Sequence, residues 1–223
     1  MWKAEGRRQN PLLTTLVCFA LREEAAPFQR LASAHPEIHI LATGIGQANA
    51  DKSLRHFLAC NSPKLVLTCG FAGGLSPELG SGTVVFSVTG SAELERKLAV
   101  AGALPGRFHC ASRIVTTTRE KQALRRTTGA DAVEMESGAI QAICREQKIP
   151  CATVRVILDA AHEDLPLDFN TITKSDLSLD YGKLVLAVAK SPGRISALVR
   201  LQKQCRFAAE RLAEVLAGVV WTS

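Results

Sequence analysis

Short apolar runs, each followed by a turn and then by a stretch with helical periodicity, recur along the chain. The clearest is Cys151–Leu158, which is rich in β-branched residues and is closed by Asp159. A run of this length and composition is typical of a buried strand. Because such strands alternate with helical patterns, we predict an α/β fold in which helices cover a central sheet.

At 223 residues the chain is long enough for one well-buried domain. We assign this domain to residues 15–218 and expect residues 1–14 to form a flexible lead-in. Strands are predicted at residues 16–20, 38–42, 65–69, 82–88, 113–116 and 151–158. Helices are predicted to begin near residues 21, 47 and 136 and to span residues 91–101, 118–126, 180–190 and 195–217.

The composition indicates a core of aliphatic side chains, since 47% of the residues are hydrophobic and only 5% are aromatic. A net charge of +6 would suit a polyanionic partner. The basic residues, however, are dispersed or gathered near the tail at helical spacing, with few aromatic residues among them. We therefore expect a solvated helix face and no nucleic acid partner, with an anionic membrane surface as a minor alternative.

The seven cysteines, an odd number without a C-x-x-C pair, lie mostly inside apolar runs. This usage is typical of reduced core cysteines in a cytoplasmic protein. The first fourteen residues lack the apolar core of a signal peptide, and no apolar run reaches about eighteen residues. The histidines lack metal-ligand spacing, so we expect no metal site.

Two carboxylates, Glu136 and Asp159, stand at the ends of apolar runs rather than on a polar face. Glu136 belongs to the first turn of a predicted helix, where the helix dipole favours a negative charge. Asp159 follows a predicted strand, and ligands of open α/β sheets bind just past the carboxyl ends of strands. Both are therefore candidate site residues. The alternative is that each carboxylate only caps a helix.

Two turns that contain glycine also follow predicted strands. Gly44-Ile45-Gly46 precedes a helical pattern and could present backbone N–H groups to an anion or a sugar, or could be a simple tight turn. Gly70 opens a glycine-bearing segment that permits close approach of the backbone to a ligand, or forms a bulge.

Four motifs occur in the order found in one enzyme superfamily. They are Ala20-Leu21-Arg22-Glu23-Glu24-Ala25, Thr43-Gly44-Ile45-Gly46, Cys69-Gly70-Phe71-Ala72-Gly73-Gly74-Leu75, and Val133-Glu134-Met135-Glu136 followed by Val154-Arg155-Val156-Ile157-Leu158-Asp159. From about Leu16 to about Leu216 the chain resembles the superfamily of purine nucleoside phosphorylases and methylthioadenosine/S-adenosylhomocysteine nucleosidases. It looks most like the hopanoid-associated phosphorylase branch, which implies an adenosyl-bearing lipid intermediate as substrate.

The resemblance implies a single-domain three-layer α/β/α fold with a central mixed sheet, and cleavage of the N-glycosidic bond of a purine nucleoside. Asp159 would protonate or hydrogen-bond N7 of the purine, and Glu24 would activate the attacking water. Glu136 would bind the ribose hydroxyls, where a carboxylate stabilises the oxocarbenium-like transition state. The other implied substrate-binding residues are Met135, Glu134, Phe71, Gly70, Phe169 and Gly44. A homo-oligomer, with a dimer favoured, and the absence of a cofactor are also implied.

Three positions depart from the superfamily pattern. Phe71 and Leu158 replace serines, and Thr68 stands where hexameric phosphorylases have an arginine that binds phosphate. We therefore favour water as the nucleophile, with phosphorolysis by inorganic phosphate as the alternative. The arginines that could recruit phosphate are Arg22, Arg113 and Arg119. The loss of polar groups at Phe71 and Leu158 leaves a non-catalytic nucleoside-binding relative as a further alternative.

Overall fold

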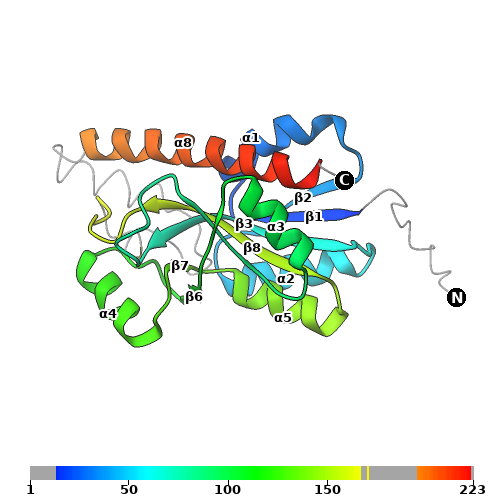
Figure 1. The fold of residues 1–223 in the computed structure, drawn as a ribbon, viewed down its shortest axis with the longest axis horizontal. Helices are drawn as coiled ribbons and strands as arrows, with labels where there is room; N and C mark the ends of the chain where they lie inside the picture. Colours follow the sequence, from blue (N-terminus) through cyan, green and yellow to red (C-terminus); the bar gives the residue numbers. More distant parts are fainter. Residues whose placement is uncertain (1–13, 167–169, 171–194, 222–223) are drawn as a thin grey trace, which may run out of the picture.

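The computed structural model describes residues 14–166, 170 and 195–221 (Figure 1). Most of the expected lead-in, the helix expected at residues 180–190 and the candidate Phe169 lie outside the described residues. The strands are β1 (Thr15–Phe19), β2 (Ile38–Ala42), β3 (Leu65–Gly74), β4 (Val84–Val88), β5 (Leu104–Pro105), β6 (Phe108–Cys110), β7 (Ala132–Glu134) and β8 (Cys151–Asp159). The described helices are α1 (Arg22–Leu31), α2 (Gln47–Leu58), α3 (Ala92–Val100), α4 (Thr118–Thr128), α5 (Ser137–Gln147) and α8 (Ile195–Val220), with a 3₁₀ turn at Ala32–Ala34.

All of these strands belong to one mixed sheet. The order along the sheet is β2-β1-β3-β8-β4-β5, and β7 pairs with both β3 and β6. The pairs β1–β2, β1–β3 and β3–β8 are parallel, whereas β4 runs antiparallel to β8. Because β1, β3 and β8 are parallel neighbours, their carboxyl ends meet at one edge of the sheet. This edge is where an α/β sheet offers a ligand site.

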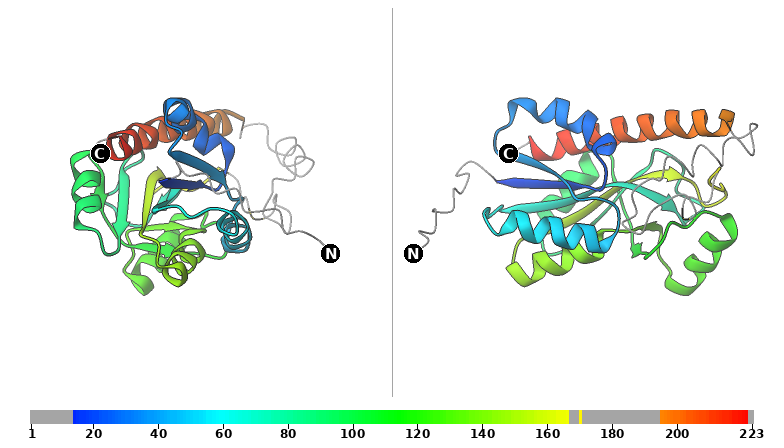
Figure 2. Two further views of the ribbon diagram at one scale, coloured as in Figure 1. Left: turned by 90° about the vertical axis from the view of Figure 1, so that its right-hand side faces the viewer. Right: turned by 180° about the vertical axis from the view of Figure 1, so that it is seen from behind.

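Each face of the sheet is covered by its own set of helices, as the views in Figure 2 show. In β1, Val17 and Phe19 pack in a core cluster with residues of α1, α3 and α8. The alternate residues Leu16 and Cys18 pack in a second cluster with residues of α2 and α5. Successive strand side chains point to opposite faces, so a wholly apolar strand is buried on both. The predicted three-layer α/β/α arrangement around a mixed sheet is confirmed.

The strand predicted at residues 113–116 is wrong. The backbone of Ile114 instead makes two hydrogen bonds with the side chain of Asn170, its N–H donating to Oδ1 at 3.0 Å and its C=O accepting from Nδ2 at 2.9 Å. The N–H of Thr116 donates to Glu120 Oε2 at 3.1 Å. Because side chains satisfy these backbone groups, the segment does not need a partner strand.

The longest described helix is α8, which begins at the predicted residue and ends at Val220, slightly beyond the predicted end. Its exposed charges include two ion pairs along the helix, Arg206 with Glu210 and Arg211 with Glu214, both at 3.1 Å. Over the described ranges, no helix combines the length and the apolar character that crossing a membrane requires.

Candidate active site

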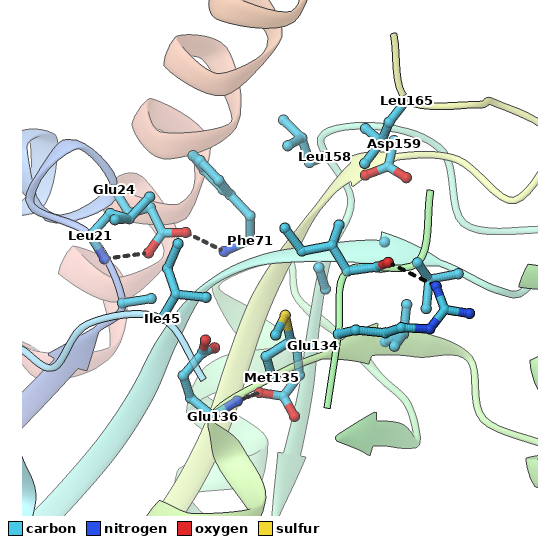
Figure 3. Close-up of a pocket in the computed structure, with 17 residues that line it drawn as sticks. Leu21, Glu24, Ile45, Phe71, Glu134, Met135, Glu136, Leu158, Asp159 and Leu165 are labelled. Atoms are coloured by element: carbon cyan, nitrogen blue, oxygen red, sulfur yellow. Dashed lines mark hydrogen bonds between the residues drawn. The ribbon is translucent and has the colours of Figure 1, made fainter. Parts of the chain in front are cut away.

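A pocket of about 190 Å³ lies where the carboxyl ends of β1, β3 and β8 meet β7 and the start of α5 (Figure 3). Most of the residues that line it are apolar. Four carboxylates interrupt this lining, and they are Glu24, Glu134, Glu136 and Asp159. Glu24 and Asp159 lie on opposite sides of the view in Figure 3, with Met135 and Glu136 below and between them.

Glu24 lies in the first turn of α1 and is buried. Its carboxylate accepts two backbone N–H groups, from Leu21 at 3.1 Å and from Phe71 at 3.3 Å. Burial raises the pKa of Glu24 to about 7, with Arg155 acting against the shift and Glu136 adding to it. A carboxyl group with such a pKa changes its protonation state near neutral pH, as a general base requires.

The buried centre of the site is Arg155 of β8, which is only 1% exposed. Its Nη2 donates to Glu134 Oε2 at 2.7 Å and to Thr68 Oγ1 at 3.2 Å, and it lies 3.2 Å from Glu136 Oε2. Burial disfavours the guanidinium, but Glu134, Glu136 and Glu24 outweigh it and raise the pKa of Arg155 above its usual range. A charge buried to this degree is tolerated because it is paired and hydrogen-bonded.

The two glutamates beside Arg155 differ in their contacts. Glu134 Oε2 accepts from the backbone N–H groups of Glu136 and Ser137 at 2.9 and 2.8 Å, and Oε1 accepts from Ser137 Oγ at 2.6 Å. The Glu134 carboxylate therefore satisfies backbone N–H groups at the start of α5 and is committed to donors of the protein. Glu136 Oε1 accepts from the N–H of Gly46 at 2.8 Å. Burial raises the pKa of Glu136, although Arg155 opposes the shift.

Asp159 is placed by a β-bulge. Ala72 of β3 pairs with Ile157 of β8, whereas the next residue, Gly73, pairs with Asp159. Leu158 is therefore the extra residue in β8. Bulges redirect side chains and are frequent beside active sites.

The Asp159 carboxylate forms an ion pair with Lys121 of α4, whose Nζ lies 2.5 Å from Oδ2. Burial raises the pKa of Asp159, while Lys121 opposes the shift. A raised pKa brings the proton of an aspartic acid closer to neutral pH, as a proton donor to a leaving group requires.

Gly70 does not line the pocket, but its lack of a side chain gives room to residues that do. Its φ angle is +143°, and an added Cβ would lie 2.7 Å from Arg155 Nη1 and 3.0 Å from Glu24 Oε2. We predicted that Gly70 allows a ligand to approach the backbone closely. In the structure, the groups that approach it are the side chains of Arg155 and Glu24.

We expect Gly70→Ala to lower the free energy of unfolding by about 1–3 kcal/mol, because the new Cβ meets Arg155 and the backbone conformation favours glycine. Urea unfolding at pH 7 measures the change. The matched control is Gly80→Ala, where no atom lies within 4 Å of an added Cβ, and its effect should stay within about 0.5 kcal/mol. Equal losses in the two variants would contradict the steric explanation.

The Gly44-Ile45-Gly46 turn uses a backbone N–H group to bind a carboxylate of the protein itself. We predicted that N–H groups of this turn could bind an anion or a sugar. The N–H of Gly46 already donates to Glu136. Gly44 has a φ of +85°, and an added Cβ would lie 3.1 Å from Cβ of Asn49. Of the three turn residues, Ile45 lines the pocket.

The pocket thus brings together most of the residues predicted from the sequence, namely Glu24, Phe71, Glu134, Met135, Glu136 and Asp159. Gly44 and Gly70 do not line it, and Phe169 lies outside the described residues. Sequence reasoning missed two charged residues, Arg155 and Lys121. Arg155 could have been found from the sequence, because a charged residue inside an apolar strand needs a buried partner. Lys121 gave no such signal, because most residues of its helix are polar.

All seven cysteines are free thiols in the structure. In the part of the chain that the structure describes, no three His, Cys, Asp or Glu side chains are grouped so as to hold a metal ion.

Solved structures of nucleosidases share this fold. Futalosine hydrolase of Helicobacter pylori superimposes with a TM-score of 0.69 at 16% identity, covering 94% of this chain and 97% of that one. A Neisseria meningitidis 5′-methylthioadenosine/S-adenosylhomocysteine nucleosidase, bound to methylthio-immucillin-A, gives 0.69 at 18% identity over 94% and 99%. The Helicobacter pylori nucleosidase of the same name gives 0.68 at 17% identity over 94% and 98%.

Residues 91–190 match the family model of the phosphorylase superfamily. This part of the chain is therefore similar to the phosphorylase superfamily. The segment that matches the phosphorylase superfamily model contains β7, α5 and β8, and with them Glu134, Glu136 and Asp159. Glu24 precedes that segment, and the pairing of β1 with β3 brings it to the same pocket.

Proposed function

We propose that this protein is an enzyme that hydrolyses the N-glycosidic bond of a purine nucleoside, with adenine as the base. The observation that carries the proposal is a single pocket in which Glu24, with a pKa of about 7, and Asp159 lie on opposite sides of Glu136. Similar solved structures are those of a futalosine hydrolase and of methylthioadenosine/S-adenosylhomocysteine nucleosidases, which supports the same reaction class.

In the proposed reaction the bond between C1′ of the ribose and N9 of the purine breaks as a water oxygen attacks C1′. Glu24 takes a proton from this water, acting as general base. Glu136 binds the ribose hydroxyls, and its negative charge stabilises the positive charge that develops on the sugar. Asp159 protonates or hydrogen-bonds N7, so that the purine leaves without a full negative charge.

The charges in the pocket favour water over phosphate as the nucleophile. Arg155 is already paired with carboxylates of the protein. Of the three arginines considered for phosphate, Arg113 lines the pocket, and its Nη2 already donates to Glu120 Oε1 at 2.7 Å. A phosphate anion would also approach Glu24 and Glu136, and like charges at short range repel.

The serine replacements do not remove the backbone contact that holds the proposed base. The N–H of Phe71 donates to Glu24 whatever the side chain is. Leu158 is the extra residue of the β-bulge, and its C=O accepts from Ser81 Oγ at 2.9 Å. These contacts favour an active enzyme over the non-catalytic relative.

The apolar remainder of the lining suits a nucleoside with an apolar 5′ substituent. Leu158 and Leu165 lie near Asp159 in Figure 3, and Leu21 and Ile45 lie near Glu24. A methylthio group meets this requirement, and so does the adenosyl-bearing lipid intermediate of the hopanoid-associated branch. The homodimer stays a prediction.

The test is incubation of the purified protein with adenosine, 5′-methylthioadenosine and S-adenosylhomocysteine, with and without phosphate, followed by chromatography of the free base and the sugar. The expected result, without phosphate, is adenine together with the free sugar, which is ribose from adenosine and a 5-substituted ribose from the other two substrates. Formation of ribose 1-phosphate would show that the reaction is phosphorolysis and not hydrolysis. Tight binding of these nucleosides without turnover would instead identify a non-catalytic relative.

The pH dependence of the rate gives a separate prediction. Because a base must be deprotonated, kcat/KM should rise as pH increases through about 7, the pKa of Glu24. Glu24→Gln should remove this rise and lower kcat on the order of 10²-fold. Glu23→Gln, on the exposed side of the same turn, is the matched control and should leave the profile unchanged. A profile of Glu24→Gln that still rises through pH 7 would exclude Glu24 as the base.

A further inference from the structure

Lys121 does not line the pocket, yet it contacts the proposed acid Asp159, which does. Its Nζ lies 2.5 Å from Asp159 Oδ2 and donates to the C=O groups of Ala160 at 2.8 Å and Glu163 at 2.6 Å. The side chain is 0% exposed. Three oxygens therefore surround one buried nitrogen. An ammonium has a proton for each of them, whereas a neutral amine would turn its lone pair toward one. This environment fits a charged Lys121.

The turn after Asp159 is fixed to α4 at other points as well. Asp164 Oδ1 accepts from the N–H and the Oγ1 of Thr118 at 2.6 and 2.7 Å. The N–H of Leu165 donates to the C=O of Thr116 at 2.9 Å. These contacts hold the turn but do not reach the Asp159 carboxylate. Docking of the turn and fixation of the carboxylate are therefore separable by mutation.

We propose that Lys121 is a positioning residue for Asp159, an inference that rests on the proposed function. Its ammonium group fixes Oδ2 and compensates the negative charge of the carboxylate. Oδ1 is then the oxygen presented to the purine. The ammonium also limits the rise in the pKa of Asp159 that burial causes, so that Asp159 can release its proton to N7 as the bond to the purine breaks.

Other titratable groups face this pair. Glu163 adds a negative charge that raises the pKa of Asp159, and its Oε2 accepts from the N–H of Ala160 at 2.9 Å. The hydrogen bonds from Thr118 lower the pKa of Asp164, and the ammonium of Lys121 adds to this effect. Burial, with smaller contributions from Glu24 and Asp159, raises the pKa of the Cys205 thiol of α8 to about 11, so this thiol is neutral at pH 7. Among these neighbours of Asp159, Lys121 supplies the positive charge.

The test compares the titration of the Asp159 carboxyl in the full-length protein and in Lys121→Met. The carboxyl ¹³C signal of aspartate-labelled protein is followed by NMR against pH and is assigned by its loss in Asp159→Asn. Loss of the ammonium should move the Asp159 titration to higher pH by about one to three pH units. The limb of the kcat/KM profile that depends on Asp159 should move in the same direction. An unchanged titration would overturn the inference.

The matched control is Asp164→Asn, which weakens the docking of the same turn on α4 without removing the charge beside Asp159. A shift in Lys121→Met alone supports positioning by charge, and an equal shift in both variants would show that Lys121 only holds the turn. If Lys121→Met does not fold, the ¹⁵Nζ signal of wild-type Lys121 replaces it. That signal should be that of an exchange-protected ammonium and should change in Asp159→Asn.

The titration separates this inference from the proposed function. If no nucleoside is cleaved but the Asp159 titration still moves in Lys121→Met, the proposed hydrolysis is refuted, whereas the effect of Lys121 on Asp159 is supported. If nucleosides are cleaved and the titration does not move, the reaction stands and the role of Lys121 is refuted.

Discussion

Asp159→Asn is expected to lower kcat for release of the purine by about 10³- to 10⁴-fold. The amide keeps the size of the carboxyl group, and its oxygen can still accept from Lys121, but it cannot deliver a proton to N7. Nucleoside binding, measured by calorimetry, should change far less than kcat, because the groups proposed to bind the ribose remain. Steady-state release of free base measures the loss.

The control is Asp131→Asn, the same substitution at another aspartate paired with a cation of α4. Asp131 Oδ1 lies 3.1 Å from Arg125 Nη1, and Asp131 does not line the pocket. The activity of this variant should stay close to that of the wild type. If Asp159→Asn kept the wild-type kcat within tenfold, Asp159 would not be the acid and the proposed reaction would lose its leaving-group step.

Arg155→Met is expected to lower the free energy of unfolding by about 3–5 kcal/mol at pH 7, since it leaves partners of a buried charge unpaired. Glu134 and Glu136, which are 4% and 5% exposed, lie 2.7 and 3.2 Å from the guanidinium. In the wild type, burial pushes the pKa of Glu134 up, but Arg155 and the hydrogen bonds from Ser137 and Glu136 outweigh it and lower that pKa. Urea unfolding of both proteins measures the difference.

The pH dependence of this loss has a defined sign. Without Arg155, burial should raise the pKa of Glu134 above its value in the unfolded chain, so that the folded variant binds protons more strongly. The deficit should therefore be large at neutral pH and shrink as pH falls toward the usual range of a glutamate. Arg96→Met is the control, because Arg96 and Glu93 are 65% and 61% exposed and solvent-exposed pairs of this kind contribute little to stability. A loss in Arg155→Met no larger than the loss in the control would show that the buried carboxylates do not depend on Arg155.

Much of the fold was predictable because strands and helices are encoded by local periodicity. The apolar run at residues 151–158 gave β8, and alternate residues of β1 pack against different helical layers. The helix predicted to start at Glu136 has its N-cap there. The segment at residues 113–116 was mispredicted because a β-branched run does not reveal that Asn170 will bind its backbone.

Local sequence specifies which residues form buried strands and places Glu24 and Asp159 just past strand ends, because burial and periodicity are properties of neighbouring residues. The contacts that these carboxylates make depend on the tertiary fold. The N–H of Gly46 binds Glu136 across 90 residues of sequence, and Lys121 donates to Ala160 across 39. Such contacts depend on how loops and helices pack at the end of the sheet, and no local pattern specifies that packing. The charges that set the pKa values of the site are therefore not visible in its motifs.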